Sequence, residues 1–272
     1  MATGNDNIER AMRAHYTKDD LGTAILEAVR ARGGDPDRPT FEDLAPFDHF
    51  HNGGRPATLA LLHLADPPRG ARVLDVGGGI GGPARTLAHD LGCQVTVLDA
   101  TPTFCDAGAL LTARTGLADR VAFRHGTALA MPFADGAFDL VWMQNVGMHI
   151  ADKGRLFAEI ARVLRPGGRF ALQDLLAGAA QPAHYPTPWA ATAADSFLPT
   201  AEELRDLLAT AGLREVARQT VPVAPPATGM TTPSPLSQLL WDEAASRAID
   251  EALRRNAAEG RVAGVMLIAE RD

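Results

Sequence analysis

Residues 73–85 read Val-Leu-Asp-Val-Gly-Gly-Gly-Ile-Gly-Gly-Pro-Ala-Arg, and this stretch decides the fold. An apolar run ends at Val76, five glycines follow, and Pro83 stands where a proline suits the first turn of a helix. Glycines adopt positive φ angles without strain and let a ligand approach the backbone. The unpaired N–H groups of the first helical turn then face that ligand. The stretch therefore predicts a strand, a ligand-binding turn and a helix.

Short apolar runs alternate with helical stretches along the chain from residue 71. Strands that are separated by helices pair in parallel through right-handed crossovers, which predicts an α/β fold with a doubly wound sheet and helices on both faces. We expect strands at residues 72–76, 94–98, 121–124, 138–143, 169–173 and 262–269. We expect helices at residues 83–90, 102–115, 153–164, 200–211 and 236–255.

The chain divides into a helical N-terminal part and a larger Rossmann-like domain. Residues 1–70 are expected to form a helical cap with an active-site loop at residues 48–54, and residues 71–272 to form the domain. Residues 177–199 follow neither a helical nor a strand period. A long irregular segment in a compact domain is usually a lid or a binding loop. We therefore expect a lid at residues 177–199.

Composition and charge exclude several classes of function. The 272 residues carry a formal net charge of −7, which argues against nucleic acid as a substrate because phosphate binding needs a basic surface. No apolar run approaches the roughly 20 residues that cross a bilayer. Residues 1–10 lack the apolar core of a secretion signal. Cys93 and Cys105 belong to no Cys/His cluster, so we expect no metal site and no disulfide. Because the sequence shows neither a membrane-spanning run nor a secretion signal, we expect no membrane contact and a cytoplasmic location.

Two carboxylates near the glycine turn narrow the choice of ligand. Gly77, Gly79 and Gly82 fit the dinucleotide pattern GxGxxG, which by itself is a weak signal. Asp75 stands two residues before these glycines, where a carboxylate disfavours a pyrophosphate and favours the ammonium group of a bound amino acid. Asp99 ends the second strand, where it would bind the ribose hydroxyls of either cofactor. The position of Asp75 therefore favours S-adenosylmethionine over a nicotinamide cofactor.

Four motifs of the chain resemble, in their order and spacing, the motifs of the class I S-adenosylmethionine-dependent methyltransferases. The resemblance spans about residues 45–220 and points to the small-molecule branch, which includes sarcosine/dimethylglycine, quinone-biosynthesis and natural-product methyltransferases. It implies a seven-stranded, mostly parallel sheet with one antiparallel edge strand, and an acceptor site under a cap. The motifs are Asp-Val-Gly-Gly-Gly at 75–79, Asp99, Met-Pro-Phe-Ala-Asp-Gly-Ala-Phe-Asp at 131–139 and Leu-Arg-Pro-Gly-Gly at 164–168.

The resemblance also assigns residues to the cofactor, S-adenosyl-L-methionine. Gly77 and Gly79 would line its methionine part, and Asp99 would hold its ribose. Gln144 and Asn145, at the end of the fourth strand, would face the methionine end and the methyl group.

Adenine contacts follow from the same resemblance. Ala100 would contact the adenine face. The family commonly has an aspartate where this chain has Thr127, so the hydroxyl or the backbone of Ala128 would replace that contact. Tyr16 resembles a tyrosine that closes over the cofactor carboxylate. The complete set of cofactor-binding candidates is Tyr16, Asp75, Gly77, Gly79, Asp99, Ala100, Thr127, Ala128, Gln144 and Asn145.

Methyl transfer needs a nucleophile in line with the bond between the sulfur and the methyl group, and it needs water to be excluded. A general base is also needed when the nucleophile is a hydroxyl or a protonated amine. Histidine suits that last role at neutral pH. His149 follows the fourth strand and His51 lies in the 48–54 loop, so both are candidate catalytic residues. A structural hydrogen-bonding role is the alternative for each of them.

Further residues are candidates for binding the acceptor. Asp174 closes the fifth strand, at the edge of the sheet where the cofactor is expected. Aromatic side chains in the lid would either sandwich a flat acceptor or anchor the lid to the core. The candidates are Asp174, His184, Tyr185, Trp189 and Phe197.

Three functions fit these patterns. The favoured one is transfer of a methyl group from S-adenosylmethionine to an oxygen, nitrogen or carbon atom of a small-molecule acceptor in specialised metabolism. The second keeps the cofactor without the transfer, as in an S-adenosylmethionine-binding cyclase. The third is a nicotinamide-dependent oxidoreductase. We consider a homodimer as the alternative to a monomer.

Overall fold

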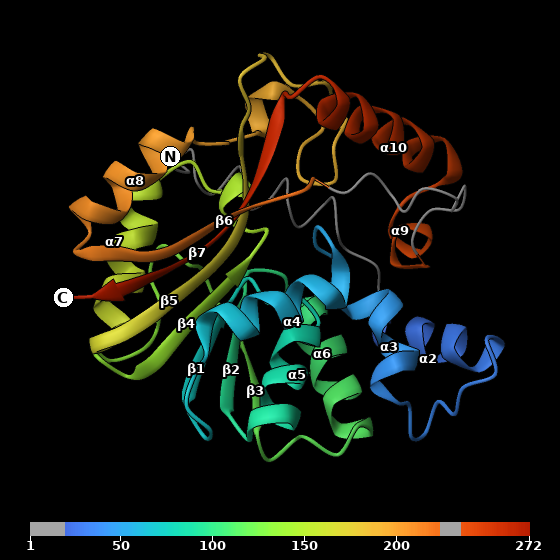
Figure 1. Cartoon of the computed structure of the whole chain (residues 1–272). Coiled ribbons are helices and arrows are strands. Elements are labelled where there is room, and N and C mark those ends of the chain that lie inside the picture. Colours follow the sequence, from blue (N-terminus) through green and yellow to red (C-terminus); the bar gives the residue numbers. More distant parts are fainter. Residues whose placement is uncertain (1–19, 224–234) are drawn as a thin grey trace, which may run out of the picture.

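The computed structural model describes residues 20–223 and 235–272, which are built on one seven-stranded sheet (Figure 1). The strand order is β3-β2-β1-β4-β5-β7-β6. Neighbours among β1 to β5 pair in parallel, as the alternation of strands and helices predicts. The strands are β1 (Arg72–Val76), β2 (Gln94–Asp99), β3 (Val121–His125), β4 (Phe138–Gln144), β5 (Leu164–Ala177), β6 (Leu213–Val221) and β7 (Val262–Arg271).

Strand β7 corrects the expectation of an antiparallel edge strand. It is antiparallel to both neighbours and lies between β5 and β6, so the edge strand is β6. Val221, at the end of β6, pairs with Gly264 near the start of β7, and Ala177, at the end of β5, pairs with Val262. The chain thus leaves β6 and enters β7 at the same edge of the sheet. Strand β7 must therefore run opposite to both neighbours.

Helices cover both faces of the sheet, and several begin at residues that cap their free N–H groups. Thr200 caps α8 through a capping box with Glu203, at the start of the helix that the sequence predicts from residue 200. The single helix expected at 236–255 is instead two helices, because the Asp242 side chain accepts a hydrogen bond from Ala245 N and starts a new one. The helices are α2 (Leu21–Ala31), α3 (Phe41–Asp48), α4 (Gly54–Ala65), α5 (Gly82–Leu91), α6 (Pro102–Arg114), α7 (Lys153–Val163), α8 (Ala201–Thr210), α9 (Pro235–Leu240) and α10 (Glu243–Ala258).

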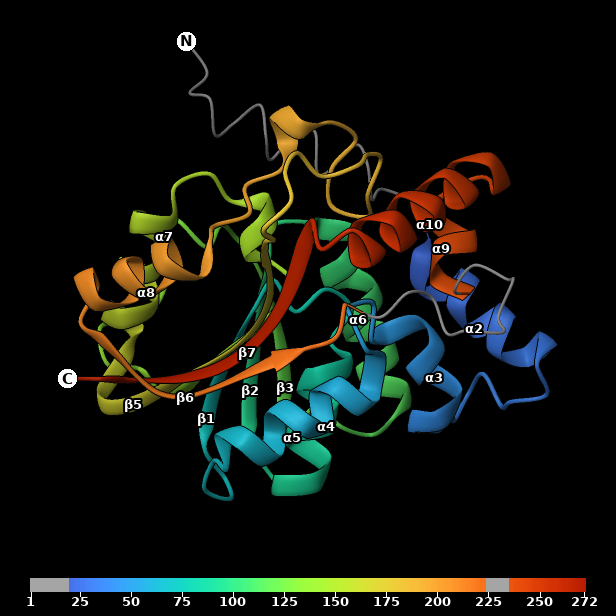
Figure 2. The same ribbon diagram turned by 45° about the horizontal axis from the view of Figure 1, so that its top comes forward.

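Helices lie on both faces of the sheet (Figures 1 and 2), and alternate residues of the central strands build two hydrophobic cores, one on each face. In β4, Val141 and Met143 pack with Phe157 of α7 in one core. Trp142, between them, packs with Leu61 of α4 in the other core. This two-residue period is the reason that a short apolar run can satisfy both layers of a doubly wound sheet.

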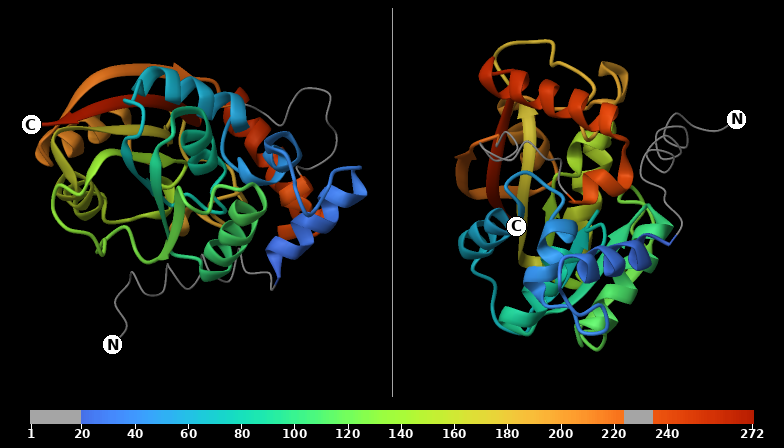
Figure 3. Two further views of the ribbon diagram at one scale, coloured as in Figure 1. Left: turned by 90° about the horizontal axis from the view of Figure 1, so that it is seen from below. Right: turned by 90° about the vertical axis from the view of Figure 1, so that its right-hand side faces the viewer.

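The N-terminal helices meet the tail of the chain at one end of the molecule. Leu21 of α2, Leu44 of α3 and Leu236 of α9 belong to one buried cluster, which also contains Ile80 of the glycine turn. Figure 3 shows the blue N-terminal helices beside the red C-terminal ones in both views. The residues expected to form a cap are thus packed against the tail as well as against the turn. The domain boundary at residue 70 remains a prediction.

A buried ion pair joins this helical part to the sheet. The guanidinium Nη2 of Arg85, in α5, lies 2.8 Å from Oδ2 of Asp48, at the end of α3, and the Arg85 side chain is fully buried. Burial raises the pKa of Asp48, but hydrogen bonding from His49 and the Arg85 charge outweigh it and hold the pKa below its usual value. Gly82 permits the approach, because a Cβ there would lie 2.2 Å from Asp48 O.

The remaining expectations from composition concern the cysteines and the membrane. Cys93 and Cys105 are both buried and carry free thiols. Within residues 20–223 and 235–272, no helix is long and apolar enough to span a bilayer.

Arg85→Met is expected to lower the free energy of unfolding by about 3–5 kcal/mol, because it leaves the Asp48 carboxylate buried without its partner. Urea unfolding followed by circular dichroism measures the loss. Arg214→Met is the matched control: Arg214 pairs with Glu270 at the surface, with 60% of its side chain exposed, and its loss should change stability by less than about 1 kcal/mol. Equal losses in the two variants would contradict a structural role for the buried pair.

Candidate functional site

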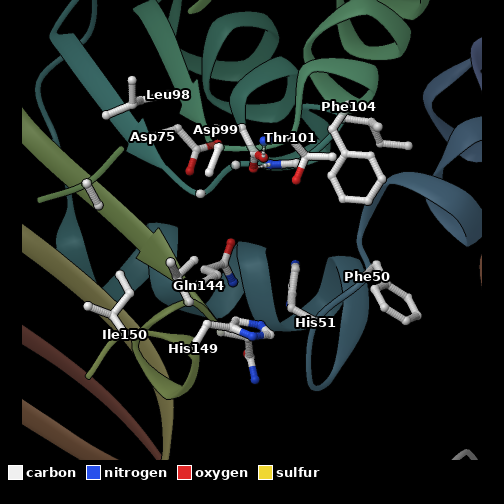
Figure 4. A pocket seen from close by; sticks show the side chains of 18 of the residues that line it. Phe50, His51, Asp75, Leu98, Asp99, Thr101, Phe104, Gln144, His149 and Ile150 are labelled. Atoms are coloured by element: carbon white, nitrogen blue, oxygen red, sulfur yellow. Dashed lines mark hydrogen bonds between the residues drawn. The ribbon is translucent and has the colours of Figure 1, made fainter. Parts of the chain in front are cut away.

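A cavity opens at the carboxyl ends of β1, β2 and β4 (Figure 4). Asp75 and Asp99 lie on one side of it, and Gln144, His51 and His149 lie on the opposite side. Parallel strands bring these residues together because their carboxyl ends meet at one edge of the sheet. The cavity is lined by most residues predicted for the site, namely His51, Asp75, Gly77, Gly79, Asp99, Ala100, Thr127, Ala128, Gln144, Asn145 and His149.

The glycine turn leaves its backbone open to the cavity. Gly77 and Gly79 have φ angles of 65° and 56°, in the left-handed region that favours glycine. A Cβ on Gly77 would lie 2.5 Å from the Val146 side chain, so this position also requires glycine for packing. A Cβ on Gly79 would meet nothing closer than the Phe104 ring at 4.0 Å. Gly79 is therefore the position at which a ligand can approach the backbone.

Asp99 connects the turns that follow β1 and β2. Its carboxylate accepts hydrogen bonds from Gly79 N at 2.9 Å and from Thr101 N at 2.8 Å. The side chain is buried, and this burial raises its pKa despite the two backbone donors. Asp99 thus holds the glycine turn in place in addition to facing the cavity.

Two buried oxygen acceptors in the cavity wall have no hydrogen-bond donor among the described residues. They are Oδ2 of Asp75 and Oδ1 of Asn145. Asn145 has a φ angle of 54°, a left-handed conformation that asparagine tolerates better than most residues, and its N–H donates to Gln173 O at 2.8 Å. Burial, with a smaller contribution from the Asp99 charge, raises the pKa of Asp75 to about 8. A positively charged group bound beside Asp75 would favour the ionised form of its carboxyl group.

His51, on the opposite wall, belongs to a network of buried polar side chains. Its Nε2 lies 3.0 Å from the Thr58 hydroxyl, which donates to Gln144 Oε1 at 3.2 Å. Gln144 also accepts from Trp142 Nε1 at 2.8 Å and donates to Gln173 Oε1 at 2.5 Å. The network fixes His51 relative to β4 and β5, so this loop residue has a defined position in the cavity.

The environment of His51 keeps its imidazole neutral near pH 7. Burial, together with the charge of the neighbouring His49, lowers its pKa to about 4. A neutral imidazole retains one nitrogen that can accept a proton. His51 therefore has the protonation state of a base.

Asp174, expected to touch the acceptor, does not line the cavity. Its carboxylate accepts from Gly147 N at 2.9 Å and from Leu175 N at 2.8 Å. Burial raises its pKa to about 6. These contacts hold the 3₁₀ turn η1 (Gly147–His149), so Asp174 acts on the position of His149 rather than facing the cavity.

The four lid candidates also lie outside the cavity lining. Phe197 donates from its N–H to Met148 O and accepts at its carbonyl from Lys153 Nζ, both next to η1. Trp189 is buried in a cluster with Met148, and its Nε1 donates to Ser196 Oγ at 2.9 Å. The lid is thus tied to the turn that carries His149, and Trp189 anchors it.

The other two lid candidates face the C-terminal helix. Asn256 of α10 exchanges two hydrogen bonds with the backbone of His184, and His184 Nε2 lies 2.9 Å from a Glu259 carboxylate oxygen. Tyr185 packs partly buried against the Trp189 cluster. Acceptor binding by these side chains remains a prediction, and Tyr16 lies outside the described residues.

Several residues of the site were not found from the sequence. Thr58 and Phe104 lie within helices and carry no local signal of function. Phe50 stands between two histidines in the 48–54 loop, which is a signal that could have been used. Leu236 reaches the cavity from the far end of the chain.

Comparison with known proteins identifies the central part of the chain. Residues 74–172 match the family model described as "Methyltransferase domain". Methyltransferase GfsG of Streptomyces halstedii is 35% identical over 134 residues, which cover 49% of this chain and 48% of that protein. The chain spans about half or less of the length of the curated relatives it matches.

Solved structures share the fold at low sequence identity. A putative sarcosine dimethylglycine methyltransferase from Galdieria sulphuraria is 20% identical with a TM-score of 0.64, and the match covers 80% of this chain and 84% of that one. The [4+2]-cyclase SpnF is 23% identical with a TM-score of 0.68, and 93% of each chain is covered. The fold is therefore that of the class I methyltransferases, with N-terminal helices added.

Asp75→Asn is expected to change how stability depends on pH. The folded chain holds the Asp75 proton up to about pH 8, whereas the ordinary pKa is 3.8, so stability falls as pH rises between these values. Asparagine does not titrate, so the free energy of unfolding of the variant should rise relative to that of the unaltered protein between pH 5 and pH 8, by up to about 1.4 kcal/mol per pH unit. Urea unfolding at several pH values measures this difference. A constant offset across the range would contradict the raised pKa.

Proposed function

We propose that this chain, whose residues 74–172 belong to the methyltransferase domain family, transfers a methyl group from S-adenosylmethionine to a small molecule. One observation carries the proposal: Asp75 and Asn145, which line the cavity beside an open glycine turn, each have a buried side-chain oxygen without a donor among the described residues. The ammonium group of an amino acid is the donor that such a pair suits. The negatively charged pyrophosphate of a dinucleotide would instead be placed against the carboxylate of Asp75, which is unfavourable.

The cavity wall supports an orientation for the cofactor. Asp99 is available to the ribose, because each carboxylate oxygen that accepts one backbone N–H can accept a further hydrogen bond. Ala100, Thr127 and Ala128 would contact the adenine, since they follow β2 and β3 and line the same cavity. The methionine part would then lie toward Gly79 and Asn145.

The residues of this chain would position the acceptor, exclude water and accept a proton. When bound, S-adenosylmethionine supplies a sulfonium methyl group that is already strongly electrophilic. The loop of His51 and the turn of His149 would hold the acceptor oxygen, nitrogen or carbon in line with that group. A neutral imidazole of His51 or of His149 would accept the acceptor's proton. Phe50 and Ile150 would exclude water from the same space.

Non-methylating use of the cofactor, as in a cyclase, is the alternative that the turnover experiment below decides. Similarity to the cyclase SpnF at 23% identity shows a shared fold and favours neither activity. A cytoplasmic location and assembly as a homodimer stay predictions.

Purified protein is expected to bind S-adenosylmethionine and its demethylated product, S-adenosylhomocysteine, in isothermal titration calorimetry. Asp99→Ala should weaken binding by more than about tenfold, because it removes both the ribose acceptor and the anchor of Gly79. Asp119→Ala is the control, since Asp119 is an exposed carboxylate outside the cavity. Incubation with a small-molecule library should form S-adenosylhomocysteine. Binding without any such product would favour the cyclase alternative, and a thermal shift with NADH in place of S-adenosylmethionine would favour an oxidoreductase.

His51→Ala is expected to lower kcat by about 10²-fold or more if His51 is the base. Because the pKa of His51 is about 4, its imidazole is already unprotonated at pH 6, and kcat should not fall between pH 7.5 and pH 6. His63→Ala, an exposed histidine of α4, is the control and should leave kcat unchanged. Retained kcat in His51→Ala together with a loss of kcat in His149→Gln would instead assign the base to His149.

A further inference from the structure

The residues of the cavity wall that are not assigned to the cofactor are largely apolar. Phe50, Ile80, Phe104 and Leu236 line the cavity and belong to a single hydrophobic cluster. We call these four residues the apolar wall. Figure 4 shows Phe50 next to His51, on the side opposite Asp75. An acceptor that enters beside His51 would therefore bury apolar surface against Phe50.

The charged side chains around the cavity are acidic. Among the described residues, those that line it include Asp48, Asp75 and Asp99, and no lysine or arginine. Arg85 neutralises Asp48 from behind the wall and is itself fully buried. Asp75 and Asp99 are assigned to the cofactor, so an anionic acceptor would find no cationic side chain in the described wall. Burial of a charge without a partner is strongly unfavourable.

The polar side chains on the side of the cavity opposite Asp75, near His51, offer hydrogen bonds rather than charge. His51 is neutral near pH 7, because burial and the charge of His49 lower its pKa to about 4. The Gln144 amide already bonds to Trp142, Thr58 and Gln173. The Gln144 amide therefore has few hydrogen-bonding positions left for a highly polar acceptor.

We propose that the methyl acceptor is an uncharged, largely apolar molecule that packs on the apolar wall and presents its nucleophile toward His51 and His149. This inference rests on the proposed function, since it concerns the second substrate of the same cavity. It excludes acceptors whose recognition depends on a phosphate, a diphosphate or a carboxylate. An uncharged acceptor needs no counter-ion, and burial of its apolar surface supplies the binding free energy.

Matched pairs of compounds that differ only in charge test the proposal. Calorimetry first measures S-adenosylhomocysteine on the free protein, and failure at this step counts against the proposed function alone. The loaded protein is then titrated with 2-naphthol and 2-naphthyl phosphate, and with geraniol and geranyl diphosphate. The uncharged member of at least one pair is expected to bind, at least tenfold more tightly than its phosphorylated partner. Equal or tighter binding of the phosphorylated members, or no binding of either uncharged member, would overturn the proposal.

A change in the apolar wall provides a second test on the same loaded protein. Phe50→Arg introduces a cation into the cavity and should strengthen binding of 2-naphthyl phosphate at least fivefold while it weakens binding of 2-naphthol. Leu59→Arg is the matched control: Leu59 is an exposed apolar side chain on α4, outside the cavity, and its replacement should change neither affinity. Equal effects of the two substitutions would show that phosphate binds by surface charge, and would contradict the wall as the acceptor site.

Discussion

The buried ion pair between Arg85 and Asp48 is the constraint on which the site depends. Arg85 lies in the helix that follows the glycine turn, and Asp48 lies at the end of α3, directly before the loop of His51. The pair therefore fixes the loop that carries one wall of the cavity against the turn that carries the other. Gly82 makes this possible by letting the two backbones meet.

Burial of carboxylates prepares the cavity for a cationic ligand. Burial raises the pKa of both Asp75 and Asp99, and the charge of Asp99 adds to the rise at Asp75. Hydrogen bonds from the backbone N–H groups of Gly79 and Thr101 hold Asp99 in place and offset part of this unfavourable burial. A cationic group bound beside Asp75 would restore the charged state of its carboxyl group. Its interaction with the ligand would thus offset the unfavourable burial of Asp75.

The opposite wall is rigid although it is made of loops. Thr58, Gln144 and Gln173 hold His51, while Asp174 and Lys153 hold the turn of His149. The lid bonds to that same turn through Phe197. Loops usually vary and move more than the elements they connect, but buried hydrogen-bond networks remove that freedom. These hydrogen bonds consequently define the positions of the two histidines relative to β4 and β5.

Local sequence patterns were sufficient to predict the parallel core of the sheet, the glycine turn and the two carboxylates at its edge. These features follow from local patterns, since strand period, turn glycines and capping residues act over a few positions. The folded chain was needed to place β7 between β5 and β6, to bring Asp48 to Arg85 and Leu236 to the cavity, and to leave Asp174 and the lid candidates outside its lining. Each of these depends on packing between segments far apart in the chain, and local patterns carry no information on which distant partner a buried group will meet.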